Sequence, residues 1–297
     1  MIAALHRIES NCGLRLTRLA RANWRSPQAQ GLIQWWPLSA CTGNVAPEIV
    51  DGNHGNTMNL SCQLRELSWR ADATFGFAPQ FDGSYEIRFP DARFPGGASP
   101  RTISLWVSYT ESPMGCIRGA FSYGATLDTH AIIIGAGDII QWQPTGALGL
   151  TLWDTFLVTP RAYDDGAWHQ VAVVLDDFGW SLYVDGRLEN FKTLAEMPTD
   201  TWFINYAFIG GLNYGSYTHF WRGLIRDVRV YGRALSAAEI WSLYDPATRF
   251  DLWAPRRSWL VEPPPPPPFL QPQAQIYVTG QESGECQHPG ATTGEVT

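Results

Sequence analysis

One stretch of the sequence carries the residue types of acid–base chemistry. His169 is followed by Asp176, Asp177 and Asp185 within "HQVAVVLDDFGWSLYVDGR". A histidine titrates near neutral pH, and a neighbouring carboxylate could orient it as a general base. The same aspartates, however, stand in "DDFG" and "DGR", where Asp and Gly are typical turn residues. We therefore predict a structural histidine at a strand start and aspartates that shape turns.

A hydrolase would show a catalytic motif in its sequence, such as a pair of carboxylates at a fixed spacing. A retaining glycosidase holds two carboxyl groups about 5 Å apart across the scissile bond, and a strand with the pattern E-x-D-x-x-E would provide them. The sequence contains neither this pattern nor G-x-S-x-G, H-E-x-x-H or G-x-x-x-x-G-K-[ST]. "GAGD", from Gly135, is predicted to be a turn between strands. The sequence predicts no enzyme, and a glycoside hydrolase is the less favoured alternative.

Aromatic side chains offer another kind of chemistry, because an aromatic ring stacks on the C–H face of a sugar. Exposed aromatics are predicted in "IIQWQP" and in the glycine-rich stretch "GGLNYGSY", with polar donors beside them. Tryptophans inside strand patterns, such as Trp106 and Trp180, are predicted to fill the core instead. The predicted ligand-binding residues are Trp142, Asn213, Tyr214, Tyr217 and His219.

The elements that would position these residues are short strands. Runs such as "ISLWVSY", "HQVAVVLD" and "WSLYVDG" are rich in β-branched and aromatic residues, and Gly, Asp, Asn or Pro separates them. "DDFG" predicts a hairpin connection in which Gly179 takes a positive φ. "FDGSYEIRF" predicts a second hairpin that turns at Asp82-Gly83.

One helix interrupts the strand pattern, in "RALSAAEIWSLYD". Ser236 is a favourable N-cap residue, and Glu239 completes a capping box three residues later. Ile240, Leu243 and Tyr244 are predicted to form its buried face. The sequence thus predicts a β-sandwich over residues 30–245 with one short helix near Ser236–Tyr244.

The order of these motifs resembles that of laminin-G-like (concanavalin A-like) jelly-roll domains. The resemblance rests on "GLIQWWPLSACTG", "QFDGSYEIRFP", "TISLWV", "DGAWHQVAVVLD", "WSLYVDGR", "FIGG" and "FWRGLIRDVRVYGRALSAAEI". It implies an all-β fold, a two-sheet antiparallel jelly-roll sandwich with one short C-terminal helix, to which extended terminal arms are added. Ligands would bind at loops on one rim or on a concave face.

A calcium site is implied by the pentraxin branch of that family. "FSYGATLDTHAIII" and "ALSAAEI" are similar to this branch, in which an Asp-Asn pair and a later acidic loop hold the metal. Asp128 matches the first acidic residue, but Thr129 replaces the Asn and "GGLNYGSY" has no carboxylate. Calcium takes about six to eight oxygen ligands. We therefore predict no cofactor; Asp128 is the candidate metal ligand, and another calcium position, at Asp82 or backbone carbonyls, is left open.

Composition limits the classes of partner. The formal net charge is −7, which argues against nucleic-acid binding. No apolar run approaches the ~18 residues of a membrane span, and charged residues interrupt the N-terminal apolar stretch, which predicts no signal peptide. The five cysteines form no C-x-x-C pair, so zinc is not indicated; a Cys41–Cys62 disulfide is left open.

Four regions follow from these patterns. An Arg-rich N-terminal arm is predicted at 1–28 and the jelly roll at 29–248; an Arg/Trp strip with a polyproline spacer follows at 249–270, and a flexible tail at 271–297. In the strip, arginines alternate with aromatic residues, so that it either docks on a partner or closes over the domain. The predicted assembly residues are Arg249, Trp253, Arg256, Arg257 and Trp259.

A folded module between two such flanks indicates part of an assembly. Laminin-G-like proteins with this architecture resemble proteins encoded among bacteriophage structural genes. That resemblance implies a non-enzymatic virion structural protein, a capsid decoration or tail appendage on the virion surface, which displays its jelly roll for surface or glycan attachment. Its partners would be other virion proteins, copies of itself and host-surface glycans. The alternative is a surface-attached carbohydrate-binding module of a cell.

Overall fold

The fold is known from a computed structural model. It describes residues 21–39, 45–50, 55–59, 68–90, 94–110, 117–124, 132–137, 143–152, 155–199, 201, 206–212 and 219–254. Several residues singled out above lie outside the described ones: Cys41, Cys62, Asp128, Trp142, Asn213, Tyr214, Tyr217, Arg256, Arg257 and Trp259.

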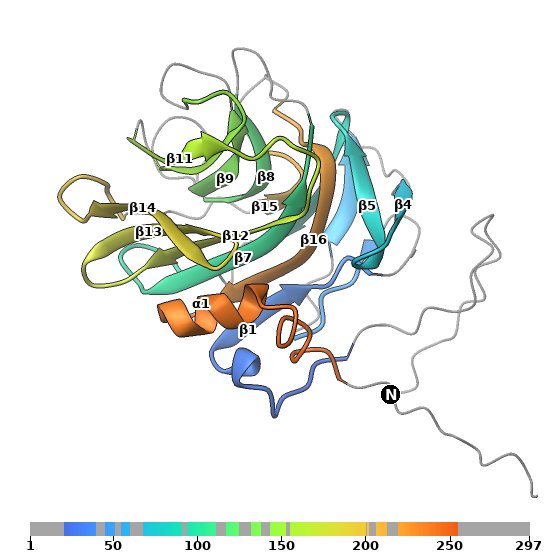
Figure 1. The fold of residues 1–297 in the computed structure, drawn as a ribbon, viewed down its shortest axis with the longest axis horizontal. Coiled ribbons are helices and arrows are strands. Elements are labelled where there is room, and N and C mark those ends of the chain that lie inside the picture. Colours follow the sequence, from blue (N-terminus) through green and yellow to red (C-terminus); the bar gives the residue numbers. More distant parts are fainter. Residues whose placement is uncertain are drawn as a thin grey trace, which may run out of the picture. The chain divides into compact units, whose positions relative to one another are not determined.

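Two antiparallel sheets form the domain (Figure 1). Sheet I consists of β1 (Leu32–Trp36), β4 (Trp69–Asp72), β5 (Gly76–Asp82), β7 (Arg101–Ser108), β12 (His169–Leu175), β13 (Gly179–Val184), β14 (Arg187–Thr193) and β16 (Arg222–Tyr231). Sheet II consists of β2 (Val45–Ala46), β3 (Gly55–Asn59), β6 (Tyr85–Pro90), β8 (Ile117–Tyr123), β9 (Ile132–Gly137), β10 (Ala147–Leu152), β11 (Thr155–Ala162) and β15 (Tyr206–Ile209).

The strand orders are β14-β13-β12-β7-β16-β5-β4 in sheet I and β11-β10-β9-β8-β15-β6-β3-β2 in sheet II. β16 pairs with β7 along one edge, while β5 and then β1 pair with its other edge. The helices are a short 3-10 turn, η1 (Pro27–Ala29), and α1 (Ala237–Tyr244). The predicted all-β sandwich with one short C-terminal helix is confirmed.

The main core lies between the two sheets. Val171 and Val173 of β12 point into it and meet side chains of sheet II such as Phe121, all at most 1% exposed. Successive residues of a strand point to opposite faces, so Ala172 and Val174 face away from sheet II, and these are buried too. β12 is therefore covered on both faces.

A second, smaller core covers the outer face of sheet I, the face that points away from sheet II. Figure 1 shows α1 on this side, with β1 beside it. Ile240 and Leu243 of α1 are buried there together with Trp35 of β1. Tyr244, predicted to be buried with them, is only half-buried. The helix thus closes the outer face of sheet I but leaves its own last ring partly open.

The predicted turn chemistry is confirmed at the β12–β13 and β13–β14 connections. The Asp176 carboxylate accepts hydrogen bonds from the backbone N–H groups of Phe178 and Gly179, at 2.8 and 3.1 Å, and Gly179 has a φ of 155°. Asp185 and Gly186 both take positive φ values, 52° and 72°, as a tight hairpin turn requires. These aspartates shape turns.

Two predictions about turns are wrong. Asp82-Gly83 does not close a hairpin, because β5 pairs with β16 in sheet I whereas β6 pairs with β15 and β3 in sheet II. Gly135 lies inside β9, which pairs with β8 on one side and β10 on the other. A Cβ at Gly135 would collide with the backbone carbonyl of Arg118. This glycine therefore permits close strand approach rather than a turn.

The segments that enter and leave the domain lie side by side. Ala22 forms an antiparallel bridge with Trp253. The Asn23 N–H donates to the Leu252 carbonyl at 2.7 Å, and the Ala254 N–H donates to the Arg21 carbonyl at 2.8 Å. The described end of the predicted arm, residues 21–28, and the start of the predicted strip, residues 249–254, are therefore part of the folded domain.

Candidate ligand-binding site

A pocket opens on the outer face of sheet I next to the end of α1, and we call it the α1 pocket. It encloses about 480 Å³. Trp106 and Ser108 of β7 and Leu224 of β16 form its floor, each at most 8% exposed. Its walls come from β4, from the loop that precedes β12 and from the residues that follow α1. Segments far apart in the sequence therefore meet here.

Three aromatic residues, Trp106, Trp168 and Tyr244, line the α1 pocket. Phe75 packs edge-on against Trp106 and Trp168, with ring centroids 5.3 and 4.9 Å apart. Tyr244 stacks on Trp106 at 6.0 Å. Trp168 and Tyr244 are half-buried, so each presents part of its ring to the pocket. Rings held by such neighbours offer a contact surface that loses little conformational entropy when a ligand binds.

Asp72 holds one of these rings in place. One carboxylate oxygen accepts a hydrogen bond from Trp168 Nε1 at 2.8 Å, and the other accepts from the backbone N–H groups of Thr74 and Phe75, both at 2.8 Å. Burial alone raises the pKa of Asp72, but these hydrogen bonds and the charge of Arg226 outweigh it and lower the pKa. Asp72 is therefore a charged group that orients Trp168.

Two arginines, Arg70 on β4 and Arg249 after α1, also line the pocket. The Arg249 guanidinium carbon lies 5.6 Å from the ring centroid of Trp106 and 5.1 Å from that of Phe250, which is cation–π geometry. Among the described residues, no carboxylate forms an ion pair with Arg249, and its buried Nε has no hydrogen-bond partner. The rings hold the guanidinium in place, while its terminal nitrogens form no ion pair with a described carboxylate.

A buried ion pair lies beneath this wall. Asp227 Oδ2 is 2.6 Å from Arg229 Nη2, and their side chains are 3% and 1% exposed. The other Asp227 oxygen accepts from Trp35 Nε1 at 2.6 Å and from Arg229 Nε at 3.1 Å. Desolvation alone would lower the pKa of Arg229, but Asp227 outweighs it and raises that pKa. The pair is charged and satisfied.

Arg229 and Gln28 connect this ion pair by hydrogen bonds to the segment that contains Arg249. Arg229 donates to the carbonyl of Arg249 at 3.1 Å and to Gln28 Oε1 at 2.8 Å. Gln28 Nε2 donates in turn to the carbonyls of Ser242 and Thr248, at 2.9 and 2.8 Å. The end of α1 and the backbone of Arg249 are thereby held from below.

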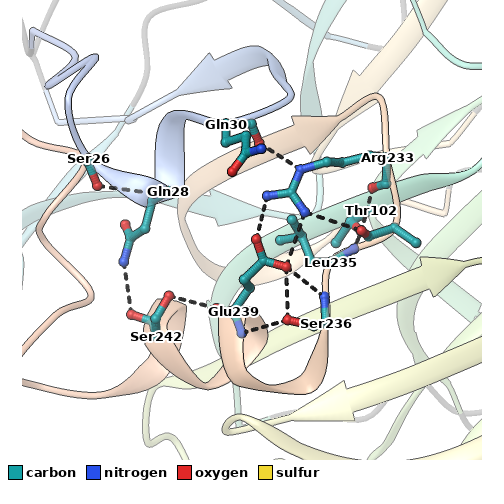
Figure 2. A network of polar contacts seen from close by, with 10 residues as sticks. Ser26, Gln28, Gln30, Thr102, Arg233, Leu235, Ser236, Glu239 and Ser242 are labelled. Carbon is teal, nitrogen blue, oxygen red and sulfur yellow. Dashed lines mark hydrogen bonds and ion pairs between the residues drawn. The ribbon is translucent and has the colours of Figure 1, made fainter.

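The start of α1 is held by the polar network in Figure 2. Ser236 Oγ accepts from the Glu239 N–H at 3.4 Å, and the Glu239 carboxylate accepts from the Ser236 N–H at 2.8 Å. This is the predicted capping box. Arg233 donates to both Glu239 oxygens, at 3.1 and 2.6 Å. The hydrogen bonds from Arg233 and Ser236 outweigh burial and lower the pKa of Glu239 to about 2.

The same network ties the helix to its surroundings (Figure 2). Arg233 Nε donates to the carbonyl of Gln30 at 2.9 Å. Thr102 Oγ1 of β7 donates to the carbonyl of Arg233 at 3.0 Å and accepts from the Leu235 N–H at 2.9 Å. The helix that carries Tyr244 is therefore joined both to sheet I and to the segment that precedes β1.

His169 is structural, as predicted. Its Nδ1 lies 2.9 Å from Asp185 Oδ2, and its Nε2 lies 3.1 Å from Asp165 Oδ1. Burial alone would lower the pKa of His169, but the two carboxylates outweigh it and raise that pKa. Both ring nitrogens are therefore engaged with carboxylates of the domain.

The predicted sugar-binding loop is described only at its base. His219 Nδ1 lies 2.7 Å from the carbonyl oxygen of Ile117. The Gly119 N–H donates to the His219 carbonyl at 3.1 Å, and the Trp221 N–H donates to that of Gly210 at 3.0 Å. His219 is thus held against β8 of sheet II. His219 does not line the α1 pocket.

The pocket residues were missed or were given other roles by the sequence. Trp106 is buried, as predicted, and in addition it forms part of the pocket floor. Arg249 was predicted to serve assembly, and it contacts its own domain, as does Trp253, whose ring lies 5.1 Å from that of Trp35. Arg70 and Trp168 carried no sequence signal, because the pocket requires five separate segments to meet.

The described residues can also be considered as metal ligands and as membrane-spanning helices. No group of three or more His, Cys, Asp or Glu side chains there is arranged to hold a metal ion. Within the same residues, no helix has the length and apolar character needed to cross a membrane.

Comparison with protein families and solved structures places the fold. The family described as "Concanavalin A-like lectin/glucanases superfamily" matches residues 81–241, from the end of β5 into α1. No curated protein matches the sequence.

Three solved structures illustrate the likeness. Domain 4 of AbnA, a GH43 extracellular arabinanase from Geobacillus stearothermophilus in complex with arabinotriose, is 20% identical, with a TM-score of 0.53 over 72% of this chain and 98% of that one. The binding domain of Paraclostridial Mosquitocidal Protein 1 is 13% identical, with a TM-score of 0.55 over 73% and 52%. Trypanosoma rangeli sialidase with sialic acid is 18% identical, with a TM-score of 0.51 over 72% and 33%. At such identities the likeness concerns the fold alone.

Proposed function

Because the chain belongs to the concanavalin A-like lectin/glucanases superfamily, we propose that it is a non-enzymatic carbohydrate-binding module whose sugar site is the α1 pocket. The observation that carries the proposal is that the rings of Trp168 and Tyr244 line one pocket of about 480 Å³ together with polar side chains. Sugars offer an apolar C–H face and a rim of hydroxyl groups, which such a cavity complements. The arabinotriose bound to the structurally similar AbnA domain supports a carbohydrate ligand.

The chemistry of the pocket supports binding without hydrolysis. A glycosidase needs two carboxyl groups about 5 to 9 Å apart, one of which donates a proton. Asp72 is the single carboxylate among the described residues that line the pocket. Its lowered pKa keeps it ionised, and its oxygens already accept three hydrogen bonds. A pocket of this kind would hold a sugar without cleaving it.

Calorimetric titration with a panel of neutral and acidic oligosaccharides tests the proposal. We expect Trp168→Ala to weaken binding about tenfold or more, since it removes one ring wall, and Trp168→Phe to restore part of the affinity. Trp24→Ala is the matched control, because Trp24 is 58% exposed and does not line the pocket. No sugar should be cleaved, which a reducing-end assay of the same mixtures would check.

The same titration compares the α1 pocket with the loop predicted from the sequence. If Tyr214→Ala with Tyr217→Ala abolishes binding while Trp168→Ala does not, the sugar site is the loop and not the pocket. If no sugar in the panel binds, the carbohydrate function itself is contradicted.

For the place of this module we propose the virion surface, as a capsid decoration or tail appendage. The architecture of the sequence motivates this, and one structural observation supports attachment through the flanking segments. The chain enters the described domain at Arg21 and leaves it at Ala254, and a hydrogen bond of 2.8 Å joins the two residues. Anchors on either flank would therefore hold the domain at one place. The alternative is a carbohydrate-binding module on a cell surface.

Mass spectrometry of purified particles tests this location, after a map of the neighbouring genes has shown whether capsid or tail genes adjoin. A chain without residues 1–20 and 263–297 keeps all described residues, so we expect it to fold but not to join particles. Full occupancy by the truncated chain contradicts the anchor role. Absence of the full chain from every particle contradicts the virion role, and recovery from a cell surface supports the alternative.

A further inference from the structure

The α1 pocket is positively charged in a chain whose formal net charge is −7. Arg70 and Arg249 line it, whereas Asp72 is the single carboxylate that lines it in the part of the chain that the structure describes. Arg226 lies close by, with its guanidinium carbon 5.3 Å from the Phe75 ring centroid, and its charge acts on Asp72. The local charge is therefore opposite in sign to that of the whole chain, which favours an anionic ligand.

Arg249 is the best-placed cation in this pocket. Stacking on Trp106 and Phe250 holds its guanidinium, and the hydrogen bond from Arg229 holds its backbone. Among the described residues its buried Nε has no acceptor. That nitrogen is closed to solvent, so a ligand would bind the terminal nitrogens of the guanidinium, which form no ion pair with a described carboxylate.

Asp72 does not neutralise Arg249. Its two oxygens accept hydrogen bonds from Trp168, Thr74 and Phe75, and no ion pair joins it to Arg249. The Asp72 carboxylate thus holds residues of the pocket wall in place and does not pair with Arg249, which can then bind a ligand.

We infer that the α1 pocket selects saccharides that carry a carboxylate, with Arg249 as the specificity-determining residue and Arg70 as a second cation. A planar guanidinium matches the two oxygens of a carboxylate, and the ring faces of Trp168 and Tyr244 flank the sugar. This inference rests on the proposed function, since it names the class of sugar for the same pocket.

A matched pair of ligands tests the inference: galacturonic acid trisaccharide and its fully methyl-esterified form, which lacks the charges. By calorimetry, we expect the full chain to bind the acid about tenfold or more tightly than the ester. Added salt should weaken binding of the acid and leave that of the ester unchanged, because mobile ions screen partly exposed charges.

Variants assign the preference to a residue. Arg249→Gln should bring the affinity for the acid to within about twofold of that for the ester, whereas Arg249→Lys, which keeps the charge but not the planar donors, should retain part of the preference. Arg187→Gln is the control, since it changes the net charge equally at an exposed residue of β14 outside the pocket. Thermal unfolding checks that each variant is folded.

Each remaining outcome is decisive. Equal affinity for acid and ester, or a preference that survives Arg249→Gln combined with Arg70→Gln, overturns the inference and leaves the carbohydrate function standing. A preference lost equally in Arg187→Gln overturns the assignment to Arg249. Failure to bind any sugar overturns the proposed function and the inference with it. If Arg249→Gln does not fold, an unchanged preference in both Arg249→Lys and Arg70→Gln overturns the inference.

Discussion

The two sheets carry the same local motif, a carboxylate two residues before an arginine. On β16 of sheet I, Asp227 and Arg229 form an ion pair of 2.6 Å whose side chains are 3% and 1% exposed. On β6 of sheet II, Glu86 and Arg88 form an ion pair of 2.7 Å, but Arg88 is 24% exposed. One motif thus produces a closed pair on one sheet and a partly open pair on the other.

The difference comes from what covers each pair. Asp227 and Arg229 lie beneath the segments before β1 and after α1, and Trp35 and Gln28 satisfy their remaining polar groups. Asp227 also has a φ of 53° at an irregularity in the β16–β7 register. Whether such an ion pair is buried therefore depends on the segments that pack over the strand and not on the residues of the strand itself.

On sheet II, aromatic rings cover the Glu86–Arg88 ion pair only in part. The Arg88 guanidinium carbon lies 5.4 and 5.3 Å from the ring centroids of Tyr206 and Phe208, and Tyr206 is 45% exposed. Burial raises the pKa of Glu86 more than the hydrogen bond and charge of Arg88 lower it. The charged form of Glu86 is therefore less well stabilised than the charged Asp227–Arg229 pair on sheet I.

The largest effect is expected from Asp227→Asn. Asparagine keeps the size of the side chain and tolerates a positive φ, but Arg229 would remain as a buried charge without its partner. Breaking such a pair costs about 3 to 5 kcal/mol, which urea denaturation would measure as a loss in the free energy of unfolding. Asp251→Asn, at an exposed residue, is the control and should change little.

Loss of the helix cap should have a smaller effect. Ser236→Ala removes one acceptor of the capping box and should lower the free energy of unfolding by about 1 kcal/mol, while Ser236→Thr should restore most of it. Sugar affinity should stay within about twofold of wild type, because Gln28 and Arg229 hold the other end of α1. A large loss of affinity would mean that the cap, and not the closed pair, positions the pocket wall.

Breaking the partly open Glu86–Arg88 pair should lower the free energy of unfolding by a still smaller amount. Glu86→Gln replaces a carboxylate whose pKa burial has already raised, and water can reach the partly exposed Arg88. The free energy of unfolding at neutral pH should change by about 1 kcal/mol or less. If this loss matched that of Asp227→Asn in the same urea titration, the contrast between the two sheets would be wrong.

The smallest effect concerns His169, which lies between two carboxylates. Its pKa is raised in the folded state, so its contribution to stability is complete below the unfolded pKa of about 6.5. That contribution is lost as the pH rises through the higher folded pKa. The difference in stability between wild type and His169→Gln should therefore shrink from about pH 5.5 upwards. A difference that grows with pH would contradict this.

Much of the secondary structure was determined by neighbouring residues and could be predicted. The alternation in β12, the turn at Asp176 to Gly179 and the capping box of Ser236 and Glu239 were all confirmed. Each depends on residues a few positions apart, whose geometry is set by the strand period, the φ that glycine permits or the first turn of a helix. Such features require no knowledge of what packs against them.

The sheet to which a strand belongs was decided by the tertiary structure. Asp82-Gly83 reverses the chain as its residues predict, yet β6 crosses to sheet II because it pairs there with β15 and β3. Gly135 reads as a turn residue in the sequence, but it allows β8 and β9 to approach closely. Pairing depends on partners distant in the chain, which a local pattern does not contain.

The candidate site shows the same division most clearly. The sequence determined that Trp106 sits in a strand and that Tyr244 ends a helix, but not that their rings stack at 6.0 Å on one face of sheet I. Arg70 and Arg249 belong to opposite ends of the domain sequence and meet only because β4 and the segment after α1 pack over the same strands. Side-chain chemistry is a property of the residue, whereas a pocket is a property of the packing between segments, and only folding brings those segments together.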